Sequence, residues 1–158
     1  MSQETINIER PWGNGRIVWT RDATADDSDK TFTVPAGKVW SVLSIEASMI
    51  CSATVGNRYL GVDITNGAAK VFSSALTGAV AASAVCGIYL APGSPPSSGT
   101  PYKVNLASGV QETVCTRDTI PTPMLLPAGY VVRVWDEAAI DAAADDLTVA
   151  LHYIEYDA

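Results

Sequence analysis

Short runs in which apolar and polar residues alternate constrain the fold of this chain more than any other feature. The segment 58–64 places Leu60, Val62 and Ile64 on one face of an extended strand, and the segment 147–156 repeats the pattern. Gly, Pro and Asn separate such runs, as turn-forming residues do between strands. Other β-rich runs occur at residues 5–9, 16–19, 30–34, 70–74 and 110–116.

Many short strands punctuated in this way predict an all-β protein. We expect a single antiparallel β-sandwich of the jelly-roll type, with at most one short helix in the Ala-rich segment 136–146. A chain of 158 residues buries a sizeable core without disulfides or metals. We predict one sandwich domain over residues 31–158, preceded at residues 1–30 by either an N-terminal arm or edge strands.

A repeated phrase marks the start of two predicted strands. The sequence VPAG occupies 34–37, and LPAG occupies 126–129. In both copies Pro suits the second position of a type I turn, and Gly suits a position with positive φ. The copies predict equivalent hairpin corners in two halves of one sandwich, with a duplicated domain as the alternative.

The strands that follow these turns are apolar on both faces. Trp40 and Val42 lie opposite one predicted core face, and Val131 and Trp135 lie opposite the other. The predicted core faces hold Val39, Ser41, Leu43 and Ile45 after the first turn, and Val132 and Val134 after the second. An extra apolar face predicts contacts with another subunit or cover by a loop.

The candidate interface with a subunit or capsid therefore consists of these four residues and two further tryptophans. Trp40 and Trp135 lie within Val-rich strands, where core or interface is the expected environment. Trp12 and Trp19 lie outside such strands, and a sugar-stacking role stays open for them. The predicted set is Trp40, Val42, Val131, Trp135, Trp12 and Trp19.

Charge and composition argue against two classes of partner. The 17 acidic and 10 basic residues give a net charge of -7, which disfavours direct binding to nucleic acid phosphates. The uncharged stretch at 78–93 is rich in Ala and Ser and too short to span a bilayer, so we expect no membrane segment. Only 17% of residues are charged, which predicts that part of the surface is buried against a protein partner.

The N-terminus carries no signal-peptide pattern, which predicts folding in a cytoplasm. In such a compartment we expect Cys51, Cys86 and Cys115 to be reduced thiols that behave as small apolar residues. Their odd number and the lack of a C-x-x-C spacing predict no metal or redox site.

The sequence contains no catalytic motif and a single histidine, His152, in a predicted strand. We therefore expect that the protein is not an enzyme and binds no cofactor. Two acidic clusters are interpreted as solvated loops, with a calcium site as the alternative if they meet in space. They comprise Asp22, Asp26, Asp27 and Asp29, and Asp136, Glu137, Asp141, Asp145 and Asp146.

Three phrases carry a resemblance to a known group of proteins. FTVPAGKVWSVLSI (32–45), APG (91–93) and LLPAGYVVRVWDEAAIDAAADDLTVALHYIEY (125–156) resemble small jelly-roll-like virion structural proteins of tailed bacteriophages. The resemblance covers most of the chain after about residue 30, and it lies in turn and strand phrasing.

The resemblance implies a capsid decoration or cement protein that binds the major capsid protein and forms a homotrimer. It also implies assembly in the host cytoplasm and a final location on the capsid surface of the virion. A tail or fibre-associated virion component is one alternative. A carbohydrate-binding β-sandwich module is another.

Overall fold

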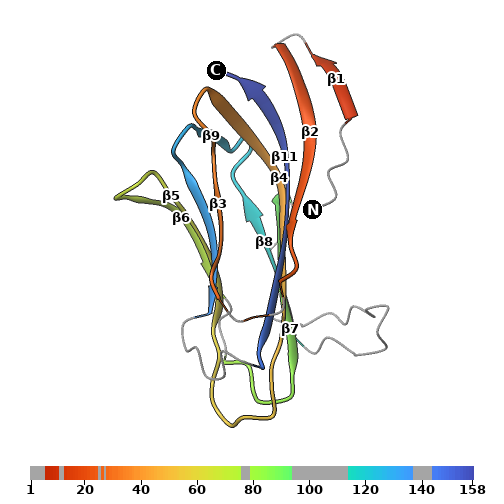
Figure 1. Ribbon diagram of the computed structural model, residues 1–158, viewed down its shortest axis with the longest axis vertical. Helices are drawn as coiled ribbons and strands as arrows, with labels where there is room; N and C mark the ends of the chain where they lie inside the picture. Colours follow the sequence, from red (N-terminus) through yellow and green to blue (C-terminus); the bar gives the residue numbers. More distant parts are fainter. Residues whose placement is uncertain are drawn as a thin grey trace.

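The computed structural model describes residues 6–10, 13–24, 26, 28–75, 79–93, 114–136 and 144–158, except for the side chains of 6–14 and 114–118. All regular secondary structure in these residues is β-strand, arranged as two sheets that pack face to face (Figure 1). The predicted all-β sandwich is confirmed. The segment 136–146, in which a short helix was expected, lies mostly outside the described residues.

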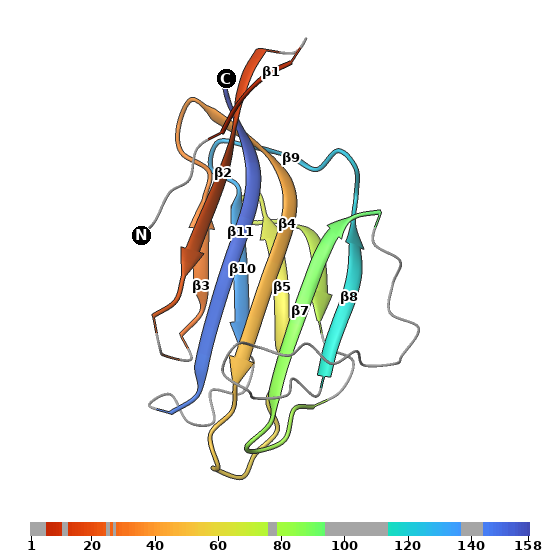
Figure 2. The ribbon, with the colours of Figure 1, turned by 90° about the vertical axis from the view of Figure 1, so that its right-hand side faces the viewer.

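The larger sheet has seven strands in the order β1-β2-β11-β4-β7-β8, with β9 paired to β4. Figure 2 shows its outer face. Its strands are β1 (Ile6–Arg10), β2 (Gly13–Asp22), β4 (Lys38–Ile50), β7 (Val85–Pro92), β8 (Val114–Ile120), β9 (Leu125–Pro127) and β11 (Asp146–Asp157). The smaller sheet has four strands in the order β3-β10-β5-β6. Its strands are β3 (Lys30–Thr33), β10 (Val131–Asp136), β5 (Leu60–Thr65) and β6 (Lys70–Ala75).

The pairing of β7 with β8 departs from the expected antiparallel arrangement. These two strands run parallel, whereas the other strand pairs among the described residues are antiparallel. Parallel neighbours need a long crossover connection, and the chain between Pro92 and Val114 has the length for one.

The core lies between the inner faces of the two sheets. The alternating residues Leu60, Val62 and Ile64 of β5 are fully buried, as the sequence pattern predicts. They lie beside the equally buried Val132 and Val134 of the neighbouring strand β10, and the opposite sheet contributes Leu147, Val149 and Leu151 of β11 to the same core. The described residues contain no helix with the length and hydropathy that a membrane span requires.

A β-bulge in β4 changes which of its residues face the core. His152 of β11 pairs with Ser44, but the next residue, Tyr153, pairs with Val42, so that Leu43 is an extra residue. A bulge of this kind shifts the alternation by one position. The core face therefore holds Ile45, Ala47 and Met49 after the bulge and Trp40 and Val42 before it. The predicted core face of Val39, Ser41, Leu43 and Ile45 is wrong for its first three residues.

The two repeated turns lie side by side. The Val34 N–H donates to the Tyr130 carbonyl at 2.9 Å, and the Gly129 N–H donates to the Val34 carbonyl at 3.0 Å. Each turn begins at its proline, because the Lys38 N–H donates to the Pro35 carbonyl and the Tyr130 N–H donates to the Pro127 carbonyl. Gly37 and Gly129 are thus third in their turns, with φ of 72° and 84°. Positive φ at this position is typical of a type II turn, in place of the predicted type I.

The N-terminal residues that the structure describes belong to the sandwich. β1 pairs with β2, and β2 pairs with β11 from Arg16 to Asp22. Val18 of β2 is buried in the core opposite Tyr153. Among the described residues, β1 is thus the edge strand of the larger sheet, and β2 lies between β1 and β11.

Candidate interaction surfaces

Two of the predicted interface residues lie in the core of the chain itself. Trp40 is 5% exposed and Val42 is 2% exposed. The Trp40 ring stacks on Tyr153 with centroids 4.1 Å apart, and its Nε1 donates to Glu155 Oε2 at 3.1 Å. The β4 bulge turns both side chains inward, so neither offers appreciable area to a partner, and we assign them to the core.

The other predicted residues lie on two opposite outer faces. Val131 and Trp135 alternate with core residues of β10 and lie half-buried on the outer face of the smaller sheet. Trp19 lies on the outer face of the larger sheet and is 39% exposed. Trp12 lies outside the described side chains.

The outer face of the larger sheet carries an aromatic pair that sequence reasoning did not combine. Trp19 of β2 and His152 of β11 are directly opposite in register, and their rings meet edge to face with centroids 5.4 Å apart. Ile17 and Ile154 form the next pair on the same face of these two strands. Ile154 is buried although it faces outward. We call these four residues the Trp19 patch.

His152 also contacts two polar residues of β4. Its Nδ1 lies 3.0 Å from the Ser44 hydroxyl oxygen and 4.0 Å from Glu46 Oε1. In a hydrolytic triad the serine and the acid engage different ring nitrogens, so that the imidazole relays a proton between them. Here both groups approach the same nitrogen, and the geometry is that of a positioned surface histidine.

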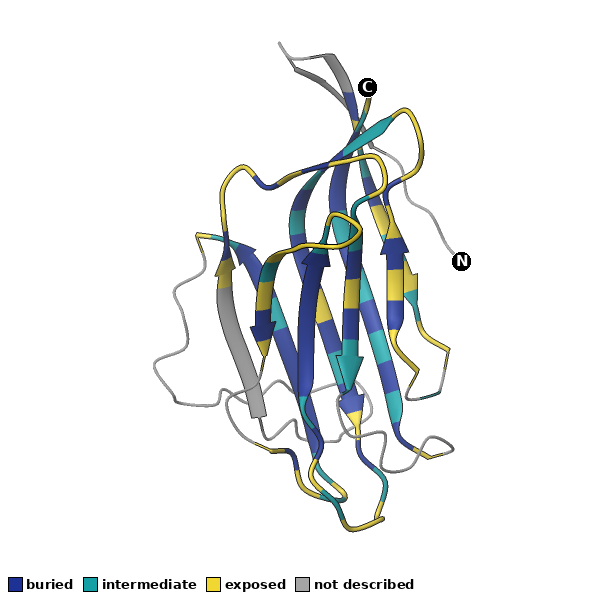
Figure 3. Cartoon of the chain, turned by 90° about the vertical axis from the view of Figure 1, so that its left-hand side faces the viewer, coloured by how far each residue is buried: buried dark blue, intermediate teal, exposed yellow. Residues whose placement is uncertain are grey.

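A row of polar side chains crosses the outer face of the smaller sheet. Register places Thr31, Arg133, Asp63 and Ser73 opposite one another on β3, β10, β5 and β6. We call these four residues the polar row. Its centre is Asp63, which is only 6% exposed even though it faces away from the core. Figure 3 looks onto this face and shows β5 buried over most of its length.

The charges of the polar row are already paired. The Ser73 hydroxyl donates to Asp63 Oδ1 at 2.7 Å, and Lys70 Nζ lies 2.9 Å from the same oxygen. Arg133 Nε donates to Asp29 Oδ2 at 2.7 Å. Burial raises the pKa of Asp63, but the hydrogen bonds from Lys70 and Ser73 outweigh it and lower that pKa below 3.8. The carboxylate therefore stays ionised and accepts hydrogen bonds.

Trp135 borders the polar row and covers Gly61. A Cβ on Gly61 would lie 2.3, 2.6 and 2.7 Å from the ring atoms Cζ2, Cε2 and Cη2 of Trp135. Cε2 and Cη2 are both bonded to Cζ2. If the edge of the ring at Cζ2 pointed at the Cβ position, both of these atoms would lie much farther from that position than Cζ2 does. The nearly equal distances mean that the ring lies flat on the Gly61 backbone. Only glycine permits this contact.

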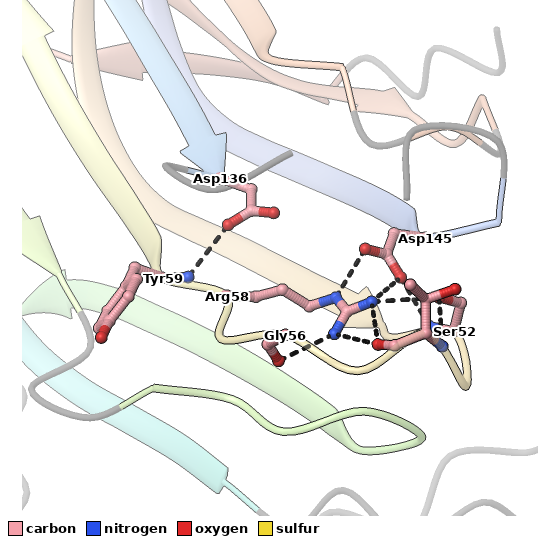
Figure 4. A network of polar contacts seen from close by, with 7 residues as sticks. Ser52, Gly56, Arg58, Tyr59, Asp136 and Asp145 are labelled. Carbon is pink, nitrogen blue, oxygen red and sulfur yellow. Dashed lines mark hydrogen bonds and ion pairs between the residues drawn. The ribbon is translucent and has the colours of Figure 1, made fainter. Parts of the chain in front are cut away.

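A buried ion pair joins the loops at one end of the sandwich (Figure 4). Arg58 and Asp145 are both 0% exposed, and Arg58 Nε donates to Asp145 Oδ2 at 2.6 Å. The guanidinium also donates to the carbonyls of Thr54 and Gly56 and to the Ser52 hydroxyl. The network thus ties the loop after β4 to the residue preceding β11.

Five acidic residues of the two clusters have structural partners, namely Asp22, Asp26, Asp29, Asp136 and Asp145. Asp26 binds Lys30 Nζ at 2.5 Å, and Asp136 Oδ1 accepts the Tyr59 N–H at 3.0 Å. The segments that carry the two clusters are joined by a backbone hydrogen bond, in which the Leu147 N–H donates to the Asp26 carbonyl. Within the described part of the chain, no three His, Cys, Asp or Glu side chains gather to hold a metal ion.

Cys51 and Cys86 are buried and are not joined in a disulfide, whereas the Cys115 side chain lies outside the described set. Comparison with protein-family models, curated proteins and solved structures gave no match.

Proposed function

We propose that this chain is a structural protein of a tailed-phage virion, a decoration or cement protein that stabilises the head by bridging major capsid subunits. The observation that carries the proposal is the Trp19 patch. The exposed Trp19 ring, together with the half-buried His152 and Ile17, provides apolar area on an outer sheet face for contact with another protein, while the buried Ile154 supports them from below. The virion assignment itself comes from the resemblance in turn and strand phrasing.

The strand order supports the same proposal. We interpret the two four-stranded sets β2-β11-β4-β7 and β3-β10-β5-β6 as a jelly roll. The chain crosses between the sheets at β2–β3, β3–β4, β4–β5, β6–β7, β9–β10 and β10–β11, and the first and last strands of these sets, β2 and β11, pair with each other. The additional strands β1 and β8 extend the larger sheet at its two edges.

In this role each subunit buries apolar area against neighbouring capsid subunits, and many weak contacts together raise the barrier to rupture of the shell. A homotrimer at a symmetry axis of the lattice supplies one copy of the patch to each neighbour. Trp19 is the expected anchor, since tryptophan is among the residues that dominate binding energy at protein interfaces.

Binding to particles that lack the protein tests the proposal. Recombinant chain is expected to co-sediment with such particles and to restore their resistance to heat. Trp19→Ser should weaken binding at least tenfold. Val71→Ser is the matched control, because Val71 is a large apolar residue, 47% exposed, on β6 of the other sheet.

Two results would contradict the head assignment. One is an absence of binding to depleted particles that are as heat-resistant as complete ones. The other is a copy number of only a few per hundred major capsid subunits, measured by quantitative mass spectrometry, which would favour the tail or fibre alternative.

A further inference from the structure

We propose that the outer face of the smaller sheet is a carbohydrate site, in which a neutral pyranose ring stacks on Trp135 and its hydroxyl groups bind the polar row. This site is separate from the Trp19 patch, which lies on the opposite sheet. It does not depend on the virion role, since the recognition chemistry belongs to this face alone.

The first element of the site is a fixed aromatic surface. One face of the Trp135 ring lies flat on Gly61, so the half-buried residue directs its remaining exposure away from the sheet. The Gly61 backbone prevents the ring from tilting inward. A flat, immobilised indole matches the apolar C–H face of a pyranose and loses little conformational entropy on binding.

The second element is the spacing between the ring and the polar row. Trp135 and Gly61 are paired, and Arg133 and Asp63 are the pair two residues away along the same strands. Two residues of a strand span roughly 6.6 Å, and neighbouring strands are about 4.8 Å apart. A pyranose centred on the indole therefore extends its hydroxyl groups over Arg133, Asp63 and Ser73.

The third element is the chemistry of the row. Arg133 offers N–H donors, the hydroxyl of the exposed Thr31 both donates and accepts, and the hydroxyl of the exposed Ser73, whose proton is donated to the largely buried Asp63, accepts. A sugar hydroxyl needs this mixture, because it is itself both a donor and an acceptor. A few placed polar groups beside an apolar surface are the usual composition of a small-molecule site.

The pairing of charges selects a neutral ligand. Lys70 neutralises Asp63, and Asp29 neutralises Arg133, so the row has no unpaired ion to attract a phosphate or a metal. A protein partner with an apolar surface would strip water from the row without replacing its hydrogen bonds. Sugar hydroxyls replace those bonds, and this difference favours a carbohydrate over a protein as the occupant.

Saturation-transfer NMR with a pyranose panel tests the site directly. The probes are cellobiose, maltose, lactose and chitobiose at millimolar concentration, with the full chain as receptor. We expect at least one sugar to receive saturation on its ring C–H protons and to alter tryptophan fluorescence. Trp135→Ala should abolish both signals, and Ser73→Ala should weaken binding about three- to tenfold, since it removes one hydrogen bond.

Trp19→Ala is the matched control, because it removes a partly exposed tryptophan from the opposite sheet. It should leave sugar binding unchanged. Since Trp135→Ala also uncovers Gly61, Trp135→Phe provides a second variant that retains a ring and is expected to bind more weakly than wild type. Circular dichroism verifies that each variant is folded.

Three results would overturn the proposal. They are no binding by any sugar of the panel, binding that survives in folded Trp135→Ala, and equal loss of binding in Trp19→Ala. A complex of this face with a protein that excludes the sugars from it would also overturn the assignment.

Discussion

Arg58 binds Asp145, which lies 87 positions later in the sequence, and neither side chain has any exposure to solvent. The guanidinium makes two hydrogen bonds to the carboxylate, at 2.6 and 3.0 Å, and the Ser52 N–H donates to the same group at 2.6 Å. Burying two charges is costly, and only complete pairing offsets that cost. The loops at this end of the sandwich are therefore organised around one ion pair.

Removing one partner of this pair should destabilise the protein strongly. Arg58→Met leaves the Asp145 carboxylate buried without its cation, and we expect a loss of about 3–5 kcal/mol in the free energy of unfolding. Urea denaturation measures it. Arg133→Met is the control, because it breaks a pair whose side chains are 50% and 36% exposed and should cost at most about 1 kcal/mol. Equal losses in the two variants would contradict a special role for the buried pair.

The Asp145 carboxyl also makes the free energy of unfolding depend on pH in the acidic range. Burial raises the pKa of Asp145, but the hydrogen bonds from Arg58 and Ser52 outweigh it and hold that pKa below 3.8 in the folded chain. A group whose pKa is lower when folded stabilises above its unfolded pKa, and this contribution is lost as pH falls through the folded value. We expect stability to decline below about pH 4, where an unfolded aspartate begins to take up its proton.

Urea unfolding at a series of pH values checks this dependence. Arg58→Met provides the comparison, since without the guanidinium the Asp145 pKa is no longer held down and the loss of stability in acid should be smaller. An acid profile identical to that of the wild type would mean that other carboxyls account for the decline.

Gly61 should be coupled energetically to Trp135. Gly61→Ala places a methyl group within 2.3 Å of the indole, and displacing the ring should cost about 1–3 kcal/mol. In the Trp135→Ala background the same change has room and should be neutral or stabilising, because alanine restricts the unfolded chain more than glycine does. A double-mutant cycle by urea denaturation measures the coupling. Independent effects of the two changes would show that the ring does not rest on Gly61.

Two tryptophans should differ in their effect on stability. Trp40→Phe removes the hydrogen bond to Glu155 and part of the stack on Tyr153, and we expect a loss of about 2–3 kcal/mol. Trp19→Phe changes a partly exposed ring and should stay within about 0.5 kcal/mol of wild type. Thermal and urea unfolding compare the two. A larger loss for Trp19→Phe would contradict the assignment of Trp40 to the core.

Local patterns predicted much of the fold. Alternation in β5 and β11 identified their buried faces, because side chains of a strand point to opposite sides whatever the strand pairs with. The positive φ of Gly37 and Gly129 also follows from residues adjacent in sequence. That the two turns hydrogen-bond to each other depends on how distant parts of the chain meet, and no local pattern contains it.

The candidate sites were less accessible to sequence reasoning. Trp40 and Val42 are predicted at an interface but lie in the core, because the β4 bulge shifts the alternation by one residue and thereby inverts the two faces of the strand. Trp135 was identified as an interface candidate, but its partner Gly61 and the polar row beside it were not. These residues come together only through the register of four strands.

The sequence by itself determined the all-β class, the inner faces of the regular strands and the glycine-dependent turns, because each depends on residues close together in the chain. The tertiary structure decided which residues of β4 face the core, the parallel pairing of β7 with β8, the Arg58–Asp145 pair and the surroundings of Trp135. Each of these is set by pairing between segments far apart in sequence. Such pairing follows from the packing of the whole core.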